Sequence, residues 1–133
     1  MDIKVKVEGD FGKTRKFLKG LLDSKTRVRN ILEKYGAKGV DALADATPVN
    51  TGLTSESWSY EIIETDKGFE LAWKNSNIVD GWYNVAILIQ YGHGTRNGGY
   101  VQGNDYINPA MRPIFDELSK QIGKEGYGIS YGL

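Results

Sequence analysis

Apolar and polar residues alternate along three short segments of this chain. Residues 2–8 place an apolar side chain at every second position between charged ones, which is the period of a half-buried β-strand. Residues 57–65 and 69–74 show a similar alternation on either side of a Thr-Asp-Lys-Gly turn at residues 65–68. A polar turn that ends in glycine between two such runs is typical of a β-hairpin, so the pattern predicts three strands.

Helical spacing of apolar residues marks two segments in the first third of the chain. Residues 11–22 predict a short amphipathic helix, and residues from about 26 to 46 predict a longer one. Either Ser24 or Thr26 can cap the longer helix. Pro48 ends it, because the residue before a proline is pushed out of the helical region.

Two glycines interrupt the longer helix. Gly36 and Gly39 lower the stability of a helix interior, because glycine loses more backbone freedom on folding than other residues. Their presence predicts either that another element packs closely against the helix at this point or that the helix bends.

A last helix is predicted to begin near residue 108. Asn108 is a favoured capping residue, and Pro109 suits the first helical position because its missing N–H would be unpaired there anyway. The apolar residues that follow have helical spacing and are Met111, Ile114, Phe115, Leu118 and Ile122.

The longest apolar run of the chain lies within residues 82–91. Its core, Val-Ala-Ile-Leu-Ile, carries no polar side chain, so the segment predicts a central strand buried on both faces. Trp82 in this segment, like Trp58 and Trp73 in the two hairpin strands, is expected to pack in the core rather than to stack on a ligand.

These elements predict a single α+β domain in which an antiparallel β-sheet of three to four strands packs against two or three α-helices. The domain core spans about residues 10–124, and residues 75–81 are rich in turn formers. Residues 125–133 are low in complexity and predict a flexible tail, either mobile or ordered only against a neighbouring subunit.

The bulk composition excludes several classes of site. A chain of 133 residues can bury a core without staples, and its seventeen basic and seventeen acidic side chains cancel. A cancelled charge gives no general attraction to nucleic acid or to an anionic membrane. The absence of cysteine excludes disulfides, thiolate zinc sites and cysteine nucleophiles. Because no apolar run could span a bilayer and no signal peptide is recognisable, a soluble cytosolic protein is expected.

Residues 92–105 contain five glycines and predict a long loop with a short fourth strand near residues 100–101. The glycines do not match a dinucleotide-binding fingerprint, because no helix follows them directly. Long loops in compact domains are commonly functional. The side chains of this loop suit contact with another protein, and the candidate interface residues are His93, Arg96, Asn97, Tyr100 and Gln102.

His93 is the only histidine of the chain. A lone histidine needs partners that converge in space before it can act in catalysis, and Asp80 and Asp105 are the candidates. Their spacing shows no convergence, and a histidine between two glycines is more typical of a turn. A small hydrolase or nuclease that uses His93 with Asp105 stays open as an alternative.

Basic residues gather in the first two predicted helices. Acidic residues dilute this cluster and no aromatic residues are interleaved with it, so a solvated helix face is favoured over a nucleic-acid-binding module. The module stays open as a second alternative. The cluster consists of Lys13, Arg15, Lys16, Lys19, Lys25, Arg27 and Arg29.

Four motifs stand in a fixed order along roughly residues 26–120. They are residues 46–53 (Ala-Thr-Pro-Val-Asn-Thr-Gly-Leu), Trp58, residues 90–92 (Gln-Tyr-Gly) and residues 108–110 (Asn-Pro-Ala). In order and spacing they resemble the HK97-type tail-component family, small neck proteins of long-tailed phages and prophages. Asn50 stands where that family commonly has aspartate, and residues 54–56 stand where a basic residue is frequent. Neither departure disturbs the turn that Asn-Thr-Gly favours.

The resemblance implies a structural virion protein, not an enzyme, that acts at the head–tail junction in tail completion or head–tail joining. A tail terminator or a minor capsid protein is the alternative within this class. The resemblance implies no catalytic residue, cofactor or metal. The implied partners are other neck, tail-tube or connector proteins, with no membrane and no specific nucleic acid. Copies are expected to form a homo-oligomeric ring in the virion and to pass through the host cytoplasm during assembly, and a monomer is the state considered for the protein in solution.

Overall fold

A computed structural model of the chain describes residues 2–9, 18–48 and 52–132. Most of the helix predicted over residues 11–22 lies outside this part, and so does most of the turn predicted before Gly52. The other predicted elements can be compared with the structure directly.

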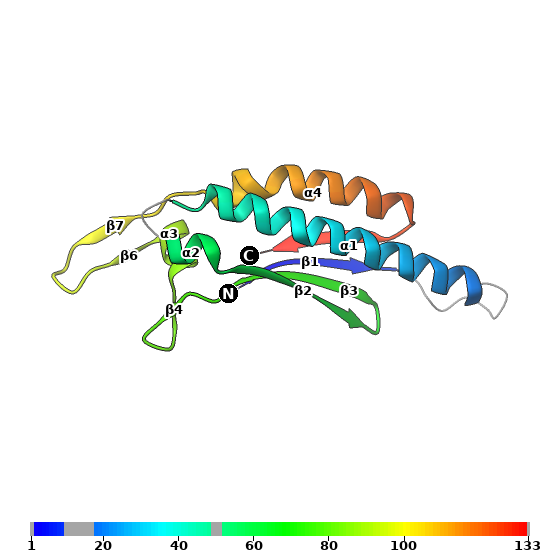
Figure 1. Ribbon diagram of the computed structural model, residues 1–133, viewed down its shortest axis with the longest axis horizontal. Helices are drawn as coiled ribbons and strands as arrows, with labels where there is room; N and C mark the ends of the chain where they lie inside the picture. Colours follow the sequence, from blue (N-terminus) through cyan, green and yellow to red (C-terminus); the bar gives the residue numbers. More distant parts are fainter. Residues whose placement is uncertain (1, 10–17, 49–51, 133) are drawn as a thin grey trace.

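A four-stranded antiparallel sheet forms one layer of the molecule (Figure 1). Its strands are β1 (Ile3–Glu8), β2 (Trp58–Thr65), β3 (Gly68–Asn75) and β8 (Gly128–Gly132), in the order β2-β3-β1-β8. The first three are the strands that the alternating pattern predicts. The β2–β3 hairpin closes through a two-residue loop, since Thr65 pairs with Gly68, and this confirms the predicted hairpin turn.

The two faces of the sheet differ because side chains alternate along each strand. Val5 on β1 lies opposite Leu71 on β3 and Tyr131 on β8, and all three belong to the face toward the helices. The apolar residues of β1 are buried, while Lys4 and Lys6 between them are exposed on the other face. The alternation in the sequence therefore sets which face of the sheet enters the core.

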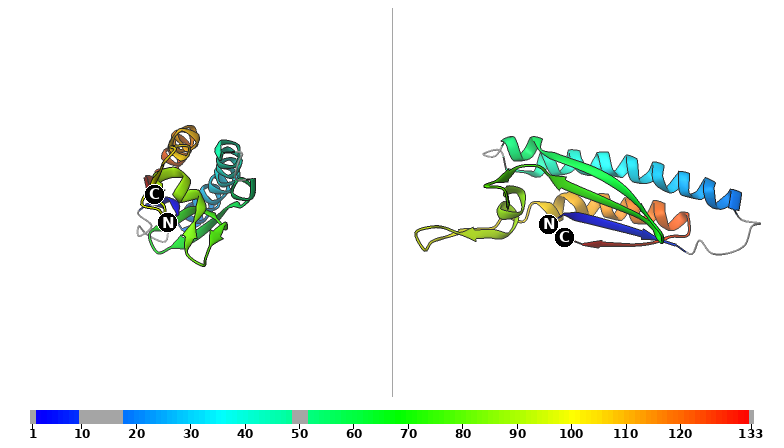
Figure 2. Two further views of the ribbon diagram at one scale, coloured as in Figure 1. Left: turned by 90° about the vertical axis from the view of Figure 1, so that its left-hand side faces the viewer. Right: turned by 90° about the horizontal axis from the view of Figure 1, so that it is seen from below.

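Two long helices cover one face of the sheet, as the end-on view in Figure 2 shows. They are α1 (Leu18–Ala46) and α4 (Ile107–Lys124), and a short helix, α2 (Gly52–Glu56), follows α1. This arrangement confirms the predicted α+β class, with one antiparallel sheet packed against helices. The helices contribute to the core through buried residues that include Val28, Leu32, Tyr35, Leu43, Met111, Leu118 and Ile122.

The glycines inside α1 allow aromatic side chains of the sheet to pack against the helix backbone. The indole Nε1 of Trp73 donates a hydrogen bond to the carbonyl of Gly36 at 2.9 Å. A Cβ atom at Gly39 would lie 2.5 Å from that Nε1, and one at Gly36 would lie 2.5 Å from Cδ2 of Tyr60. Of the two explanations that the sequence leaves open, close packing is therefore the one that the structure shows.

Both predicted helix caps are wrong. Because α1 begins at Leu18, Ser24 and Thr26 lie inside the helix rather than at its start. Asn108 lies inside the first turn of α4, which begins at Ile107. The amide of Ile107 is instead satisfied from outside the helix, as described below.

Residues 82–91 do not form a central strand. A small hairpin of β4 (Ile78–Val79) and β5 (Tyr83–Asn84) precedes a short helix, α3 (Val85–Tyr91). The side-chain oxygen of Asn84 accepts a hydrogen bond from the amide of Ile87 at 3.4 Å, which caps α3. Gly92 ends the helix with a φ of 80°, in the region that favours glycine.

The C-terminal residues are ordered within the domain, so the prediction of a flexible tail over residues 125–133 is wrong for its described part. Strand β8 pairs with β1 along its whole length. Ile129 packs against the core, and Tyr131 stacks on Phe115 of α4 with 4.5 Å between the ring centroids. These contacts fix the strand without a neighbouring subunit.

Candidate interaction surface at the hairpin end

Residues 77–104 form one end of the molecule, which we call the hairpin end. It contains β4, β5, α3 and a second hairpin of β6 (Gly92–Gly94) and β7 (Tyr100–Gln102). In Figure 1 the β6–β7 hairpin extends away from the helices and the sheet at the left, and the β4–β5 hairpin extends below α2 and α3. The two hairpins are thus presented beyond the packed layers.

The segment predicted as a long loop is mostly a β-hairpin. Strands β6 and β7 are paired from Gly92 opposite Gln102 to Gly94 opposite Tyr100. The predicted short strand near residues 100–101 is confirmed as β7. At the tip, the amide of Thr95 donates to the carbonyl of Gly99 at 2.9 Å, and the amide of Gly99 donates to the Thr95 hydroxyl at 3.0 Å. The tip is therefore a defined turn.

The buried side chain of Gln90 ties the base of this hairpin to the start of α4. Its Oε1 accepts hydrogen bonds from the amides of Tyr106 at 3.1 Å and Ile107 at 3.0 Å. Its Nε2 donates to Oδ1 of Asp105 at 2.7 Å. The first amides of a helix have no partner within the helix, so Gln90 acts as a cap supplied by α3. We call this set of contacts the Gln90 clamp.

Two further hydrogen bonds complete the base of the hairpin. The hydroxyl of Tyr106 donates to the carbonyl of Ala86 at 2.7 Å, and the amide of Asn104 donates to the carbonyl of Ile89 at 2.8 Å. Burial raises the pKa of the Tyr106 phenol above its ordinary value, so this hydroxyl stays a donor. The hydrogen bond from Gln90 lowers the pKa of Asp105, whose carboxylate also accepts from Asn108.

Exposed apolar side chains concentrate at the hairpin end. Trp82 is 71% exposed and Tyr100 is 67% exposed, which is unusual for aromatic residues. Seven of the ten large hydrophobic residues that are exposed in the described part of the chain lie here, and they are Ile78, Val79, Trp82, Tyr83, Tyr91, Tyr100 and Val101. A concentration of exposed apolar side chains at one end of a small protein is typical of an interaction site.

The prediction that Trp82 packs in the core is wrong, whereas Trp58 and Trp73 are buried as predicted. Trp82 lies at the β4–β5 turn and stacks on Tyr83 with 3.7 Å between ring centroids. The preceding Asp80 and Gly81 both have positive φ angles of 55° and 79°, as a tight hairpin turn requires. That Asp-Gly pair is a hairpin signal in the sequence, and it places Trp82 at the turn, before the apolar run of residues 85–89.

The structure places all five candidate interface residues on the β6–β7 hairpin. His93 pairs with Val101 in the ladder, and Arg96 and Asn97 lie exposed at the tip. Tyr100 and Gln102 lie on β7, where the Tyr100 hydroxyl donates to the carbonyl of Tyr91 at 3.0 Å. The sequence did not identify the neighbouring exposed residues Trp82, Tyr83, Tyr91 and Val101 as parts of this surface.

His93 has no catalytic arrangement within the described residues. Its Nδ1 lies 3.1 Å from the carbonyl oxygen of Gly94, and no described carboxylate bonds its ring. Asp105, the proposed partner, is held by Gln90 and Asn108 instead. Within residues 2–9, 18–48 and 52–132, no three His, Cys, Asp or Glu side chains gather closely enough to hold a metal ion.

Several members of the predicted basic cluster form ion pairs with acidic residues. Lys25 and Arg29 both contact Glu64, at 3.3 and 3.4 Å, and Arg27 contacts Glu125 at 2.9 Å. The other members, Lys13, Arg15, Lys16 and the side chain of Lys19, lie outside the described part. These pairs leave less positive charge available to a phosphate backbone.

The motif at residues 46–58 acts as a joint between α1 and the sheet. The hydroxyl of Thr47 donates to the carbonyl of Leu43 at 2.6 Å and accepts from the indole Nε1 of Trp58 at 2.9 Å. The hydroxyl of Ser55 on α2 donates to the carbonyl of Ala44 at 2.8 Å. The described residues of this motif thus orient β2 relative to the end of α1.

Comparison with known proteins yields no relative: no protein-family model, curated protein or solved structure matches this chain. In the part of the chain that the structure describes, no helix combines the length and the apolar character that crossing a membrane requires.

Proposed function

We propose that this protein is a structural component of a tailed phage or prophage that acts at the head–tail junction, in tail completion or head–tail joining. In this proposal the hairpin end is its docking surface for other neck, tail-tube or connector proteins. The helices and the sheet serve as a rigid support, and no step of catalysis is assigned to the chain.

One observation carries the proposal: a defined pair of hairpins presents most of the exposed apolar side chains at one end of the molecule. The Gln90 clamp fixes the base of this surface before any partner binds. A preorganised surface of this kind lowers the entropic cost of association. The order of the four sequence motifs, which resembles that of small neck proteins, supports the choice of partner class.

Two alternatives of another class receive less support. A hydrolase that uses His93 needs a base partner, and Asp105 is committed to the Gln90 clamp. A nucleic-acid-binding module needs free cations, and several basic residues of α1 are paired with glutamates. Within the virion class, a tail terminator or a minor capsid protein would use the same surface toward different partners.

Shortening the β6–β7 hairpin tests the proposal. We would replace residues 94–100 by an Asn-Gly dipeptide, which joins the paired residues His93 and Val101 through a tight turn and leaves the Gln90 clamp intact. In a phage or induced prophage that lacks the native gene, this variant should fold but leave filled heads and tails unjoined. Electron microscopy of the lysate and plaque counts measure the outcome.

A matched control separates docking from catalysis. Asp105→Asn keeps an oxygen that accepts from Gln90 and leaves the exposed side chains of the hairpin unchanged, so it should complement the missing gene nearly as well as the native protein. Infectious, joined particles from the shortened hairpin would contradict the proposal. Loss of function in Asp105→Asn with an unchanged fold would favour the catalytic alternative.

A further inference from the structure

The sheet has two edges, and the edge at β8 is unusually open to pairing. Among the described residues, β2 and β8 each have a neighbouring strand on one side only. Strand β8, with the sequence Gly-Ile-Ser-Tyr-Gly, carries no charged residue and no proline. Natural edge strands are commonly protected by such residues, because unpaired backbone groups attract another strand.

A second copy of the chain, in the same orientation as the first, can continue this sheet. Each strand in the order β2-β3-β1-β8 is antiparallel to its neighbour, so β8 runs opposite to β2. The β2 of an identically oriented copy would therefore be antiparallel to β8. Four strands advance about 19 Å across a sheet and two packed helices about 16 to 20 Å, so both layers could repeat together.

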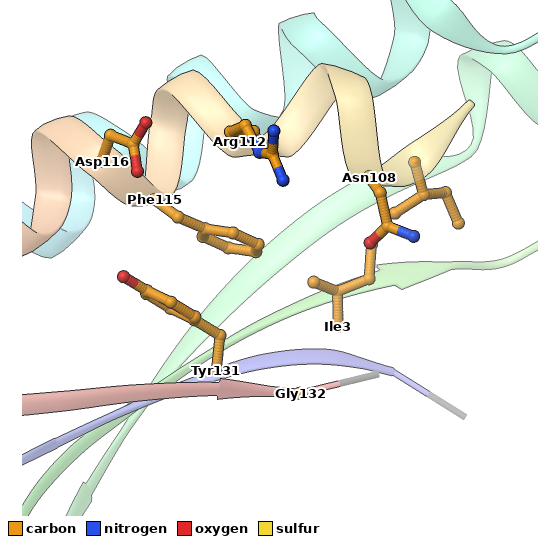
Figure 3. A pocket seen from close by; sticks show the side chains of 8 residues that line it. Ile3, Asn108, Arg112, Phe115, Asp116, Tyr131 and Gly132 are labelled. Atoms are coloured by element: carbon orange, nitrogen blue, oxygen red, sulfur yellow. The ribbon is translucent and has the colours of Figure 1, made fainter. Parts of the chain in front are cut away.

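Both edges carry a groove between a helix and the edge strand. The groove at the β8 edge, about 370 Å³, has Ile3, Ile107 and the stacked rings of Phe115 and Tyr131 as its apolar lining (Figure 3). Its polar side chains come from Asn108, Arg112 and Asp116 of α4, and Arg112 is the one basic residue among them. The grooves are thus part of the surfaces that a repeated sheet would bring together.

The groove at the β2 edge, about 340 Å³, is also partly apolar, and its one charged lining residue is acidic. Its lining residues are Ala37, Val40, Asp41, Ser59 and Tyr60. Arg112 lies five residues from the start of α4, and Asp41 lies five residues from the end of α1. These two helix ends lie at the same end of the molecule (Figure 1), so the two charges would stand at similar heights, about 7 to 8 Å from the ends. Neither forms an ion pair with a described residue.

We infer that copies of this chain associate head to tail, with β8 of one copy paired to β2 of the next and Arg112 facing the next copy's Asp41. Because the contact joins two different surfaces, it generates a ring if the rotation between copies closes. The inference rests on the proposed assembly of several copies at the head–tail junction, and it assigns that assembly to the sheet edges rather than to the hairpin end.

Cysteine trapping in the purified full-length protein tests the contact, since the native chain has no cysteine. Within one copy, the register places Ser130 in the same row as Lys6, Glu70 and Ile63, all on the face away from the helices. The double variant Ser130→Cys with Ile63→Cys should therefore give a ladder of disulfide-linked dimers, trimers and larger species under mild oxidation. Ser59→Cys or Glu61→Cys in place of Ile63→Cys would report a stagger between copies.

The matched control pairs Ser130→Cys with Glu117→Cys, which lies exposed in the helix layer beside Lys38. At least one of the edge pairs should give several-fold more higher oligomers than this control. No excess in any edge pair would overturn the inference. A dimer from Ser130→Cys alone, with no ladder in the double variants, would overturn it in favour of a two-fold contact between two β8 strands.

A charge swap provides a second readout. Arg112→Asp or Asp41→Arg alone should reduce the trapped ladder several-fold, and the two substitutions together should restore it. An undiminished ladder in both single variants would overturn the assigned ion pair. The trapping result is independent of the particle assay: a ladder with joined particles from the shortened hairpin would keep the edge contact and remove the docking role of the hairpin end. No ladder, together with unjoined particles from the shortened hairpin, would remove the edge contact and keep the docking role of the hairpin end.

Discussion

Large hydrophobic residues are mostly buried in the helix–sheet layers and mostly exposed at the hairpin end. In the layers, apolar side chains of α1, α4 and the sheet point toward one another and exclude water. At the hairpin end, Trp82 and Tyr100 point outward, and a small number of hydrogen bonds hold the backbone in place. The layers thus supply the stability of the fold, whereas recognition is the role proposed for the hairpin end, so substitutions should separate the two.

The two tryptophans Trp73 and Trp82 give the largest contrast. Trp73→Ala should lower the free energy of unfolding by about 3–5 kcal/mol, because it empties a fully buried site and removes the hydrogen bond to Gly36. Trp82→Ala should change it by no more than about 0.5 kcal/mol, because the side chain is exposed. Urea denaturation followed by circular dichroism measures both values.

The particle assay should show a role of Trp82 that the stability measurement does not. Trp82→Ala is expected to fold normally and to reduce the yield of joined particles, since exposed aromatic residues are the usual energetic centres of interfaces. If Trp82→Ala destabilises the fold as much as Trp73→Ala, the division between the two regions is wrong.

Loss of the Gln90 clamp should loosen the hairpin end without loosening the helix–sheet layers. Gln90→Leu keeps the size of the side chain but leaves the amide of Ile107 without its acceptor and the amide of Tyr106 with the carbonyl of Asn104 alone, at a cost of about 1–3 kcal/mol. The loss should appear as faster hydrogen exchange at Asn104, Tyr106 and Ile107, with little change in β1 and β3.

Gln102→Leu is the matched control for this variant, because Gln102 lies exposed on β7 of the same hairpin. It should leave hydrogen exchange at the hairpin base unchanged. Equally faster hydrogen exchange in β1 and β3 after Gln90→Leu would show that the hairpin end and the layers open together. That result would contradict the separation of the two regions.

The contrast also explains which elements could be predicted from the sequence. Strands β1, β2 and β3 and helices α1 and α4 each bury one face against the same core, so their apolar residues repeat with the period of the element. Strand β8 follows the same rule, since Tyr127, Ile129 and Tyr131 alternate with small residues. Its glycine-rich composition is typical of a flexible tail, whereas the alternation of its larger residues indicates a strand.

The hairpin end was predicted poorly because its apolar residues do not report burial. The run at residues 85–89 fits a buried strand or a short helix equally well, and periodicity cannot separate the two at this length. The capping residues Asn84 and Gly92 were the available signal for α3. The Gln90 clamp joins residues 15 to 17 positions apart and depends on the path of the hairpin between them. No local pattern could have indicated it.

The smallest expected effect is a pH dependence confined to the Gln90 clamp. The hydrogen bond from Gln90 lowers the pKa of Asp105 below 3.8, so the carboxylate form is favoured in the folded state. As the pH falls, the Asp105 carboxylate is protonated in the unfolded chain before it is protonated in the folded one. The stabilisation of the folded state by this carboxylate is therefore complete above the ordinary pKa of 3.8 and is lost as the pH drops through the lower folded pKa. Hydrogen exchange at Ile107, corrected for its intrinsic rate, should therefore show more frequent opening in acid than near neutral pH. Asp105→Asn keeps an oxygen that can accept from Gln90 but cannot titrate, so its opening should not change with pH over this range. An acid response of the same size in Asp105→Asn would assign the effect to the layers, and would leave the hairpin end with no pH sensitivity of its own.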